Sequence, residues 1–561
     1  MNPRARDHGK RRSWLRWLLT VAALLAVAIP LVASQFRQEI PMVAVPDQGG
    51  AYVEAAVGNP SYINPVLLQY NQVDRDLSAL IFSGLTRIDE QGLVVPDLAE
   101  RWEIGDDGKS YLFHLRSDVR WHDHTPFTAD DVVFTIKAIQ EDDFQGSPDV
   151  ADLWRHVTVE QAGDYAVRFT LKETFAPFLE YTSVGVLPRH LYADAVGKAM
   201  VDSPYNLRPI GTGPFKLTRI SAEGVVLEPY AEYYGPPAHL AQLRFRFYQD
   251  YSSALAALEN GEVDGFPYLD PRDATGLAAS EKLTVYSIPD YQKYAILFLN
   301  NSNPLFKEKA VRQAVAYAID RERIVQEVLG GHGVAGKGLV SPGSWAFDPK
   351  VGTYGYDPQK AEALLGTAGW LDSNGDGIRD KDGVDLSFVI LTNDNQRRVK
   401  TGELVAEDLR KVGFKTEVQA TGWSDLLKGY LVSRTYVGAI AEQWLLTADP
   451  DVYSLWHSSQ MTNGGFNLSG MANEQMDRLL EEARRTVDRN RRAQLYSEVQ
   501  ALWAEECPSV ILYYPEFNWA VSRNIKGIDL TTLVDGSSRF RHVSQWYMRT
   551  KMVPATPIPN R

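Results

Sequence analysis

The sequence predicts a large mixed α/β protein built from several lobes and preceded by an N-terminal apolar helix. Three observations lead to this fold class. The chain has 561 residues with 44% hydrophobic and 23% charged side chains, which is the balance of a globular protein with a large core. Short apolar runs alternate with amphipathic helical patterns, and no repeat of about 20 to 50 residues is visible. A strongly basic start is followed by a long uncharged run.

The N-terminal segment, residues 1–36, has the features of an export signal or a membrane anchor. Its first 16 residues hold six basic side chains and one acid, and residues 17–36 carry no charge. A signal peptide has an apolar core of about 7 to 15 residues and a spanning helix needs about 20, so the run favours an uncleaved anchor over about residues 14–36. Pro30 and the small residues 32–34 support the alternative, which is cleavage. The body is expected outside the cytoplasm, anchored to the cell membrane or, after cleavage, periplasmic or secreted.

The rest of the chain is acidic. The whole chain has a formal charge of −13 and residues 1–36 contribute +5, which leaves −18 for residues 37–561. Nucleic-acid binding needs a concentrated basic face, so this class is excluded. Cys507 is the only cysteine in the sequence, so neither an intramolecular disulfide nor a CxxC zinc site can form.

Caps and periodicity place the secondary-structure elements. Thr128 and Asp131 start a helix over residues 129–140, and Asp357-Pro358 start another that ends near Gly369. Apolar residues at three- and four-residue spacing predict the longest helical segments, residues 307–329 and 473–506. Strands are expected at residues 111–116, 165–171, 224–229, 243–248, 294–299 and 386–391. Residues 37–50 are predicted to be a linker and residues 551–561 a loose tail.

Catalytic signatures are missing from the sequence. It has no GxSxG or HExxH motif, no kinase motif set and no candidate cysteine nucleophile. Residues 331–336 fit GxGxxG, but they follow the end of a predicted helix, where the helix dipole disfavours a phosphate. His122 and His124 would face one side of an extended segment, without a visible third metal ligand. We therefore predict that the protein is not an enzyme.

One loop, residues 372–380, matches most of a calcium-binding loop. Asp372, Asn374, Asp376 and Asp380 stand at positions 1, 3, 5 and 9, and the carbonyl of Ile378 stands at position 7. Position 12 is a glycine instead of the bidentate Glu, which predicts a weaker, structural Ca²⁺ site. The alternative is an acidic turn without an ion. No cofactor is required by the predicted function.

Several longer blocks stand in a fixed order along the chain. They are residues 95–102 (VPDLAERW), 107–116 (DGKSYLFHLR), 121–123 (WHD), 127–132 (FTADDV), 211–217 (GTGPFKL), 261–264 (GEVD), 311–320 (VRQAVAYAID), 356–358 (YDP) and 508–514 (PSVILYY). Together they resemble the bacterial extracellular solute-binding proteins of family 5, the receptors of oligopeptide, dipeptide and nickel ABC importers. The likeness extends from about residue 51 to residue 547.

The resemblance implies a two-lobed, periplasmic-binding-protein-like fold of type II, in its large three-domain variant, with a hinge and a ligand cleft between the lobes. Lobe I would consist of residues 51–86, 208–290 and 514–550, an inserted domain II of residues 87–207, and lobe III of residues 291–513. Such a receptor would act as a monomer that closes on a small solute, first of all an oligopeptide or peptide-like ligand, and delivers it to an ABC permease. The alternative is an envelope chaperone, sensor or signalling protein on the same fold without an import partner.

The resemblance also implies which residues line the cleft. Peptide-binding relatives place an Asp three residues after a cleft tryptophan, where it pairs with the α-ammonium group of the peptide. This chain has Thr447 at that position after Trp444, and a hydroxyl cannot neutralise a buried cation. Glu442 or Asp449 would have to supply the charge from a displaced position. The candidate ligand contacts are Trp423, Trp444, Thr447, Asp449, Glu442 and Asn64. The alternative for both tryptophans is packing in the lobe core.

Overall fold

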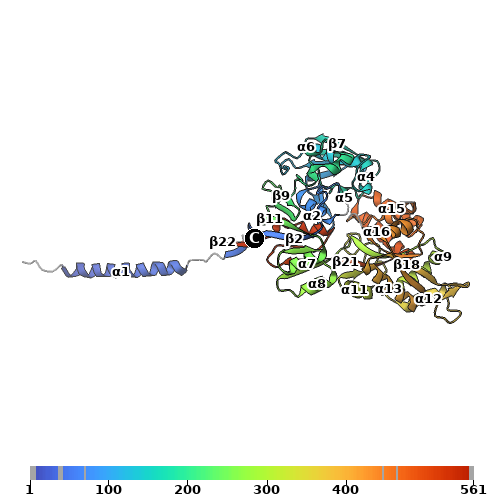
Figure 1. The fold of residues 1–561 in the computed structure, drawn as a ribbon. Coiled ribbons are helices and arrows are strands. Elements are labelled where there is room, and N and C mark those ends of the chain that lie inside the picture. The colour runs from blue at the N-terminus through green and yellow to red at the C-terminus, as the bar shows by residue number, and fades with distance from the viewer. Residues whose placement is uncertain (1–7, 36–41, 69–70, 445–447, 463–464, 555–561) are drawn as a thin grey trace, which may run out of the picture. The chain divides into compact units, whose positions relative to one another are not determined.

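A computed structural model describes residues 8–35, 42–68, 71–444, 448–462 and 465–554 (Figure 1). The chain divides into two compact units. One unit is formed by the two ends of the chain, up to residue 48 and from residue 549, and the other is the body, residues 49–548.

The unit formed by the chain ends contains a helix and a two-stranded sheet. Helix α1 spans His8–Gln35, and β1 (Met42–Asp47) pairs antiparallel with β22 (Arg549–Pro554). The predicted linker and the start of the predicted tail are therefore paired strands. A membrane span needs about 20 apolar residues, and no helix within the described ranges is long and apolar enough to cross a membrane. The membrane helix predicted from the sequence is thus not supported.

A single sheet runs through both lobes of the body. Among the described residues its strand order is β19-β18-β20-β14-β21-β12-β2-β11-β10-β9, and β13 and β15 also pair with β21. The first half of β21 (Ser509–Ser522) pairs with β14 (Lys293–Leu299) and β15 (Gly333–Ala335). Its second half pairs with β12 (Gly265–Pro267) and β13 (Leu283–Pro289). The chain therefore crosses between lobes I and III at residues 289–293 and in the middle of β21, where a hinge is expected.

Lobe I supplies one half of this sheet. Its other strands are β2 (Ala51–Val57), β9 (Phe215–Ser221), β10 (Gly224–Pro229) and β11 (Gln242–Tyr248), and its helices are α2 (Gln72–Ile81), α7 (Tyr251–Glu259) and α8 (Pro271–Ala278). A short pair, β3 (Thr86–Ile88) and β4 (Val94–Pro96), leads into domain II. The buried guanidinium of Arg539 pairs with the carboxylates of Glu54 and Asp76. This network ties the C-terminal segment of lobe I to β2 and α2.

Domain II has its own antiparallel sheet, with the order β5-β6-β8-β7. The strands are β5 (Ala99–Ile104), β6 (Ser110–Leu115), β7 (Val157–Gly163) and β8 (Ala166–Leu171), and the helices are α3 (Ala129–Gln140), α4 (Pro148–Arg155), α5 (Phe178–Tyr181) and α6 (Arg189–Tyr192). The capping box of Thr128 and Asp131 forms as predicted at the start of α3. Domain II and lobe I share one hydrophobic core, which includes Trp121, Trp154 and Trp519.

Lobe III covers its half of the sheet with helices. The remaining strands are β16 (Asp380–Lys381), β17 (Val384–Asp385), β18 (Ser387–Asn393), β19 (Lys415–Thr421) and β20 (Gly438–Trp444). The helices are α9 (Pro304–Lys307), α10 (Lys309–Ala318), α11 (Arg321–Leu329), α12 (Pro358–Thr367), α13 (Gln396–Lys411), α14 (Tyr453–Trp456), α15 (Glu474–Arg485) and α16 (Arg489–Glu506). Separate hydrophobic clusters lie on the two faces of the sheet.

The two longest predicted helical segments are each interrupted. In the first segment, residues 307–329, Lys307 ends α9 and the rest forms α10 and α11, because the Asp320 side chain accepts a hydrogen bond from the Arg323 backbone N–H and starts a new helix. Residues 473–506 likewise form α15 and α16, and Asp488 caps the second helix. The spacing of apolar residues continues across such a break, because the helices before and after it both bury an apolar face. Periodicity alone therefore did not reveal the break.

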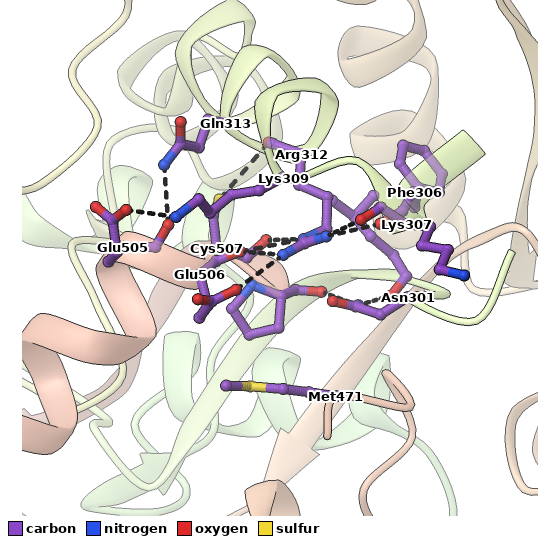
Figure 2. A network of polar contacts seen from close by, with 12 residues as sticks. Asn301, Phe306, Lys307, Lys309, Arg312, Gln313, Met471, Glu505, Glu506 and Cys507 are labelled. Atoms are coloured by element: carbon purple, nitrogen blue, oxygen red, sulfur yellow. Dashed lines mark hydrogen bonds and ion pairs between the residues drawn. The ribbon is translucent and has the colours of Figure 1, made fainter. Parts of the chain in front are cut away.

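Arg312, in the block at residues 311–320, has a structural role (Figure 2). Its guanidinium is buried and donates hydrogen bonds of 2.6–3.2 Å to the carbonyl oxygens of Phe306, Lys307, Glu506 and Cys507. These carbonyls belong to the ends of α9 and α16, where backbone acceptors have no partner inside the helix. Arg312 therefore links the ends of these two helices within lobe III.

Candidate functional site

A cavity lies beside the hinge, between lobe III and the other two parts of the body. Its lining comes from residues 89–92 of domain II, 531–534 of lobe I, 288–292 at the hinge, and 339–345 and 448–452 of lobe III. The aromatic rings of Tyr291 and Trp345 are part of the lining. The cavity volume of about 90 Å³ holds several water molecules but no peptide. In this conformation the cavity is therefore too small for a peptide-sized ligand.

Asp449, one of the predicted ligand contacts, lies in this lining but is paired with an arginine. Its two carboxylate oxygens accept hydrogen bonds of 2.7 Å from the two terminal nitrogens of Arg492. Each side chain is only 6% exposed. Burial raises the pKa of Asp449, and the bond to Arg492 opposes this rise. Detaching Asp449 to bind a ligand would leave a buried guanidinium without its partner, at a cost of several kcal/mol.

Trp423 and Glu442, two further predicted contacts, lie around one arginine of α13. The guanidinium carbon of Arg398 is 5.9 Å from the centroid of the Trp423 ring, and one of its nitrogens is 3.3 Å from a Glu442 carboxylate oxygen. Arg398 also donates a 3.0 Å hydrogen bond to the Asn393 side chain. Trp423 is 45% exposed, so its ring is not in the lobe core. Trp423, Arg398 and Glu442 together combine an accessible aromatic face with a partly exposed ion pair. Such a combination can bind a polar, planar part of a ligand.

The remaining predicted ligand contacts are Trp444, Thr447 and Asn64. Trp444 ends β20, and its backbone stands opposite Lys293 at the hinge. Thr447 lies outside the described residues. Asn64 is fully buried, where its amide donates a 2.9 Å hydrogen bond to Asn206 of domain II and its oxygen accepts one from the Val66 backbone. Asn64 therefore joins lobe I to domain II, and its side chain is not accessible to a ligand in this conformation.

Sequence reasoning did not identify the arginines that neutralise the predicted carboxylates. Arg398 lies in the first turn of α13, and Arg492 lies 43 positions after Asp449. Neither spacing forms a recognisable motif. The one available signal was that Arg492 stands where the amphipathic pattern of α16 requires a buried residue, since a buried arginine needs an acidic partner.

The predicted calcium loop is a mostly exposed turn between α12 and β16, and its last residue, Asp380, begins β16. The Asp372 carboxylate accepts hydrogen bonds from the Gly375 and Gly377 N–H groups, and Asp380 accepts them from Ser373. In the described ranges no group of three or more His, Cys, Asp and Glu side chains is arranged to hold a metal ion. The Ca²⁺ site stays a prediction. His122, a second metal candidate, is buried between the backbones of Gly211 and Gly213, and burial lowers its pKa to about 4.

Comparison with known proteins finds one family along most of the body. Residues 94–466 match the profile of the bacterial extracellular solute-binding proteins, family 5. The chain is 32% identical to the oligopeptide-binding protein AppA of Bacillus subtilis over 531 residues, covering 92% of this chain and 96% of AppA. It is 28% identical to the dipeptide-binding protein of Escherichia coli, covering 94% of this chain and 100% of that protein.

Solved structures of similar proteins have the same fold. The structure of B. subtilis AppA in complex with a nonapeptide matches with a TM-score of 0.70 and 30% identity, over 90% of this chain and 100% of AppA. NikZ from Campylobacter jejuni in complex with Ni(L-His) matches with a TM-score of 0.71 and 29% identity, over 89% of this chain and 99% of NikZ. One fold in these relatives therefore holds ligands as different as a peptide and a metal complex.

Proposed function

Because the chain belongs to family 5 of the bacterial extracellular solute-binding proteins, we propose that it captures a peptide-like solute between its lobes, as a monomer, and delivers it to an ABC permease. Members of this family are extracellular or periplasmic receptors of ABC importers and are not enzymes. The observation that carries the proposal is the cavity beside the hinge, whose walls come from both sides of the cleft. A receptor needs ligand contacts on both sides, since only these favour the closed form over the open one.

The arginine partners of the two candidate carboxylates favour a ligand without a free α-ammonium group. Asp449 and Glu442, the two carboxylates that we expected to replace the missing Asp, are both paired with arginines. A cationic ligand group would have to compete with Arg492 or Arg398 for them, and Thr447 offers no charge. We infer that the preferred ligand is an N-blocked peptide or another peptide-like molecule without a cationic end.

Calorimetry with trialanine and N-acetyltrialanine tests this ligand class. The unaltered protein should bind the acetylated peptide more tightly, and Thr447→Asp should raise affinity for trialanine more than for N-acetyltrialanine. Trp444→Ala should weaken binding of both peptides by roughly 5- to 150-fold if its ring stacks on the ligand. Tight binding of trialanine by the unaltered protein would contradict the argument and indicate a conventional peptide receptor. Native mass spectrometry of the purified body would identify a ligand that is retained through purification.

A separate proposal concerns the N-terminal segment. We propose that residues 1–36 direct export and are removed by cleavage near the small residues 32–34; the basic start supports export, and Pro30 with these small residues supports cleavage. Cell fractionation with intact-mass analysis distinguishes the alternatives. A soluble product that begins near Gln35 would support cleavage, whereas a full-length chain in the membrane fraction would indicate that the segment is retained as an anchor.

A further inference from the structure

Domain II and lobe III touch each other although the chain never runs directly from one to the other. Both are connected only to lobe I, domain II as an insertion and lobe III through the hinge strands. Nevertheless the backbone N–H of Ala176, just before α5, donates a 2.7 Å hydrogen bond to the carbonyl of Arg484 at the end of α15. The guanidinium carbon of Arg484 lies 5.4 Å from the centroid of the Phe175 ring. Domain II therefore contacts lobe III through specific residues.

A second contact lies at the wall of the cavity. Glu180 of α5 is 8% exposed, and hydrogen bonding from the backbone N–H groups of Asp449 and Ala448 acts to lower the pKa of its carboxyl against the effect of burial. These two residues also line the cavity beside the hinge. Any movement that widens the cavity by shifting this wall away from domain II must break the bonds to Glu180. The contact is therefore possible only while the lobes are closed.

We propose that Ala176, Glu180, Arg484 and the Ala448–Asp449 backbone form an interlobe latch, through which domain II stabilises the closed form and sets ligand affinity without touching the ligand. The inference rests on the solute-binding function proposed above. A ligand binds the closed form more tightly, so its apparent affinity changes with the closed fraction of the free protein. At acidic pH the buried Glu180 carboxyl is protonated and accepts these bonds as a neutral group, so loss of the two contacts should lower the closed-to-open ratio by about tenfold.

The latch is also expected to respond to pH. Burial, together with the nearby charge of Asp449, raises the pKa of Glu180 to about 8, while Arg492 and the two backbone N–H groups act in the opposite direction. In an open form Glu180 would be in water, with a pKa near 4.3, so closing takes up a proton between these values. The closed form is therefore favoured most at acidic pH, and this contribution is lost as pH rises towards 8 and above.

Single-molecule fluorescence energy transfer measures the latch without any ligand. Donor and acceptor dyes are placed on exposed sites of domain II and lobe III by Asp106→Cys and Asn490→Cys. The native Cys507 is buried and burial raises its pKa to about 12, so it does not compete for the dyes. In the double-cysteine protein, refolded to remove bound solute and measured at pH 5, Glu180→Ala should increase the ratio of the longer-distance to the shorter-distance population by about tenfold. The matched control is Glu173→Ala, an exposed glutamate five residues before α5 that should leave the distances unchanged.

A second variant keeps the test decisive if Glu180→Ala folds poorly. Glu180→Gln keeps an acceptor oxygen but cannot ionise, so the closed population should persist and its change between pH 5 and pH 8 should disappear. Equal distance distributions for the unaltered protein and Glu180→Ala, or the same pH response in Glu180→Gln, would overturn the latch. Because no ligand is present, these outcomes are independent of whether the peptide binding proposed above is observed.

Discussion

The variant Asp449→Asn tests whether the Asp449 carboxylate stabilises the fold or binds the ligand. The structure pairs Asp449 with Arg492 through two 2.7 Å bonds, and both side chains are almost fully buried. Asp449→Asn leaves the buried guanidinium without its counter-charge, so we expect a loss of about 3 to 5 kcal/mol in the free energy of unfolding. If Asp449 instead served mainly as the anion for a ligand, the variant would lose affinity and keep its stability.

Urea unfolding followed by circular dichroism measures this loss. The midpoint should fall while the slope with urea concentration stays the same, because the change does not alter the surface exposed on unfolding. Glu442→Gln is the matched control, since its pair with Arg398 is longer, at 3.3 Å, and partly exposed, and should cost at most about 1 kcal/mol. The reasoning would be refuted by an unchanged midpoint in Asp449→Asn together with a loss of N-acetyltrialanine binding.

Two further predictions concern a buried histidine and the acidic loop. Burial lowers the pKa of His122 to about 4, below its unfolded value near 6.5, so the unfolded state binds more protons between these pH values. The free energy of unfolding should therefore fall by about 3 kcal/mol from pH 6.5 to pH 4, and urea titrations of His122→Gln should show a shallower fall; parallel curves would exclude this origin. For the loop, Ca²⁺ at 100 times its dissociation constant should add about 2.7 kcal/mol, and Asp376→Ala should remove the gain. Identical melting temperatures with Ca²⁺ and with a chelator would identify the loop as an acidic turn.

Much of the local structure could be predicted because its causes are local. The capping box at Thr128 and Asp131 and the cap at Asp357 satisfy backbone groups within one turn, and the helices α3 and α12 start there. The six predicted strands all form, within two residues of their expected ends. The breaks at Asp320 and Asp488 were missed, because the apolar pattern that predicts a helix continues through a change of direction.

The candidate site was predictable only in part. The sequence placed Trp423 and Glu442 among the ligand contacts, and the structure brings both to Arg398. It did not indicate that Asp449 already has a buried partner, because Arg492 comes from a helix that follows much later in the chain. A carboxylate that the sequence suggests as a ligand contact can already be paired with an arginine in the folded protein. The ligand that the site prefers then changes.

The sequence by itself determined the class of this protein, its acidic body and most of its helices and strands, because composition, caps and the period of apolar residues act over short stretches of chain. Only the tertiary structure decided that β1 and β22 pair within the unit formed by the chain ends, that β21 passes through both lobes, and that Glu180 lies against the backbone of Ala448 and Asp449. These contacts join residues separated by hundreds of positions. Their free energy depends on burial and on which charges become neighbours, and neither quantity exists until the lobes have packed.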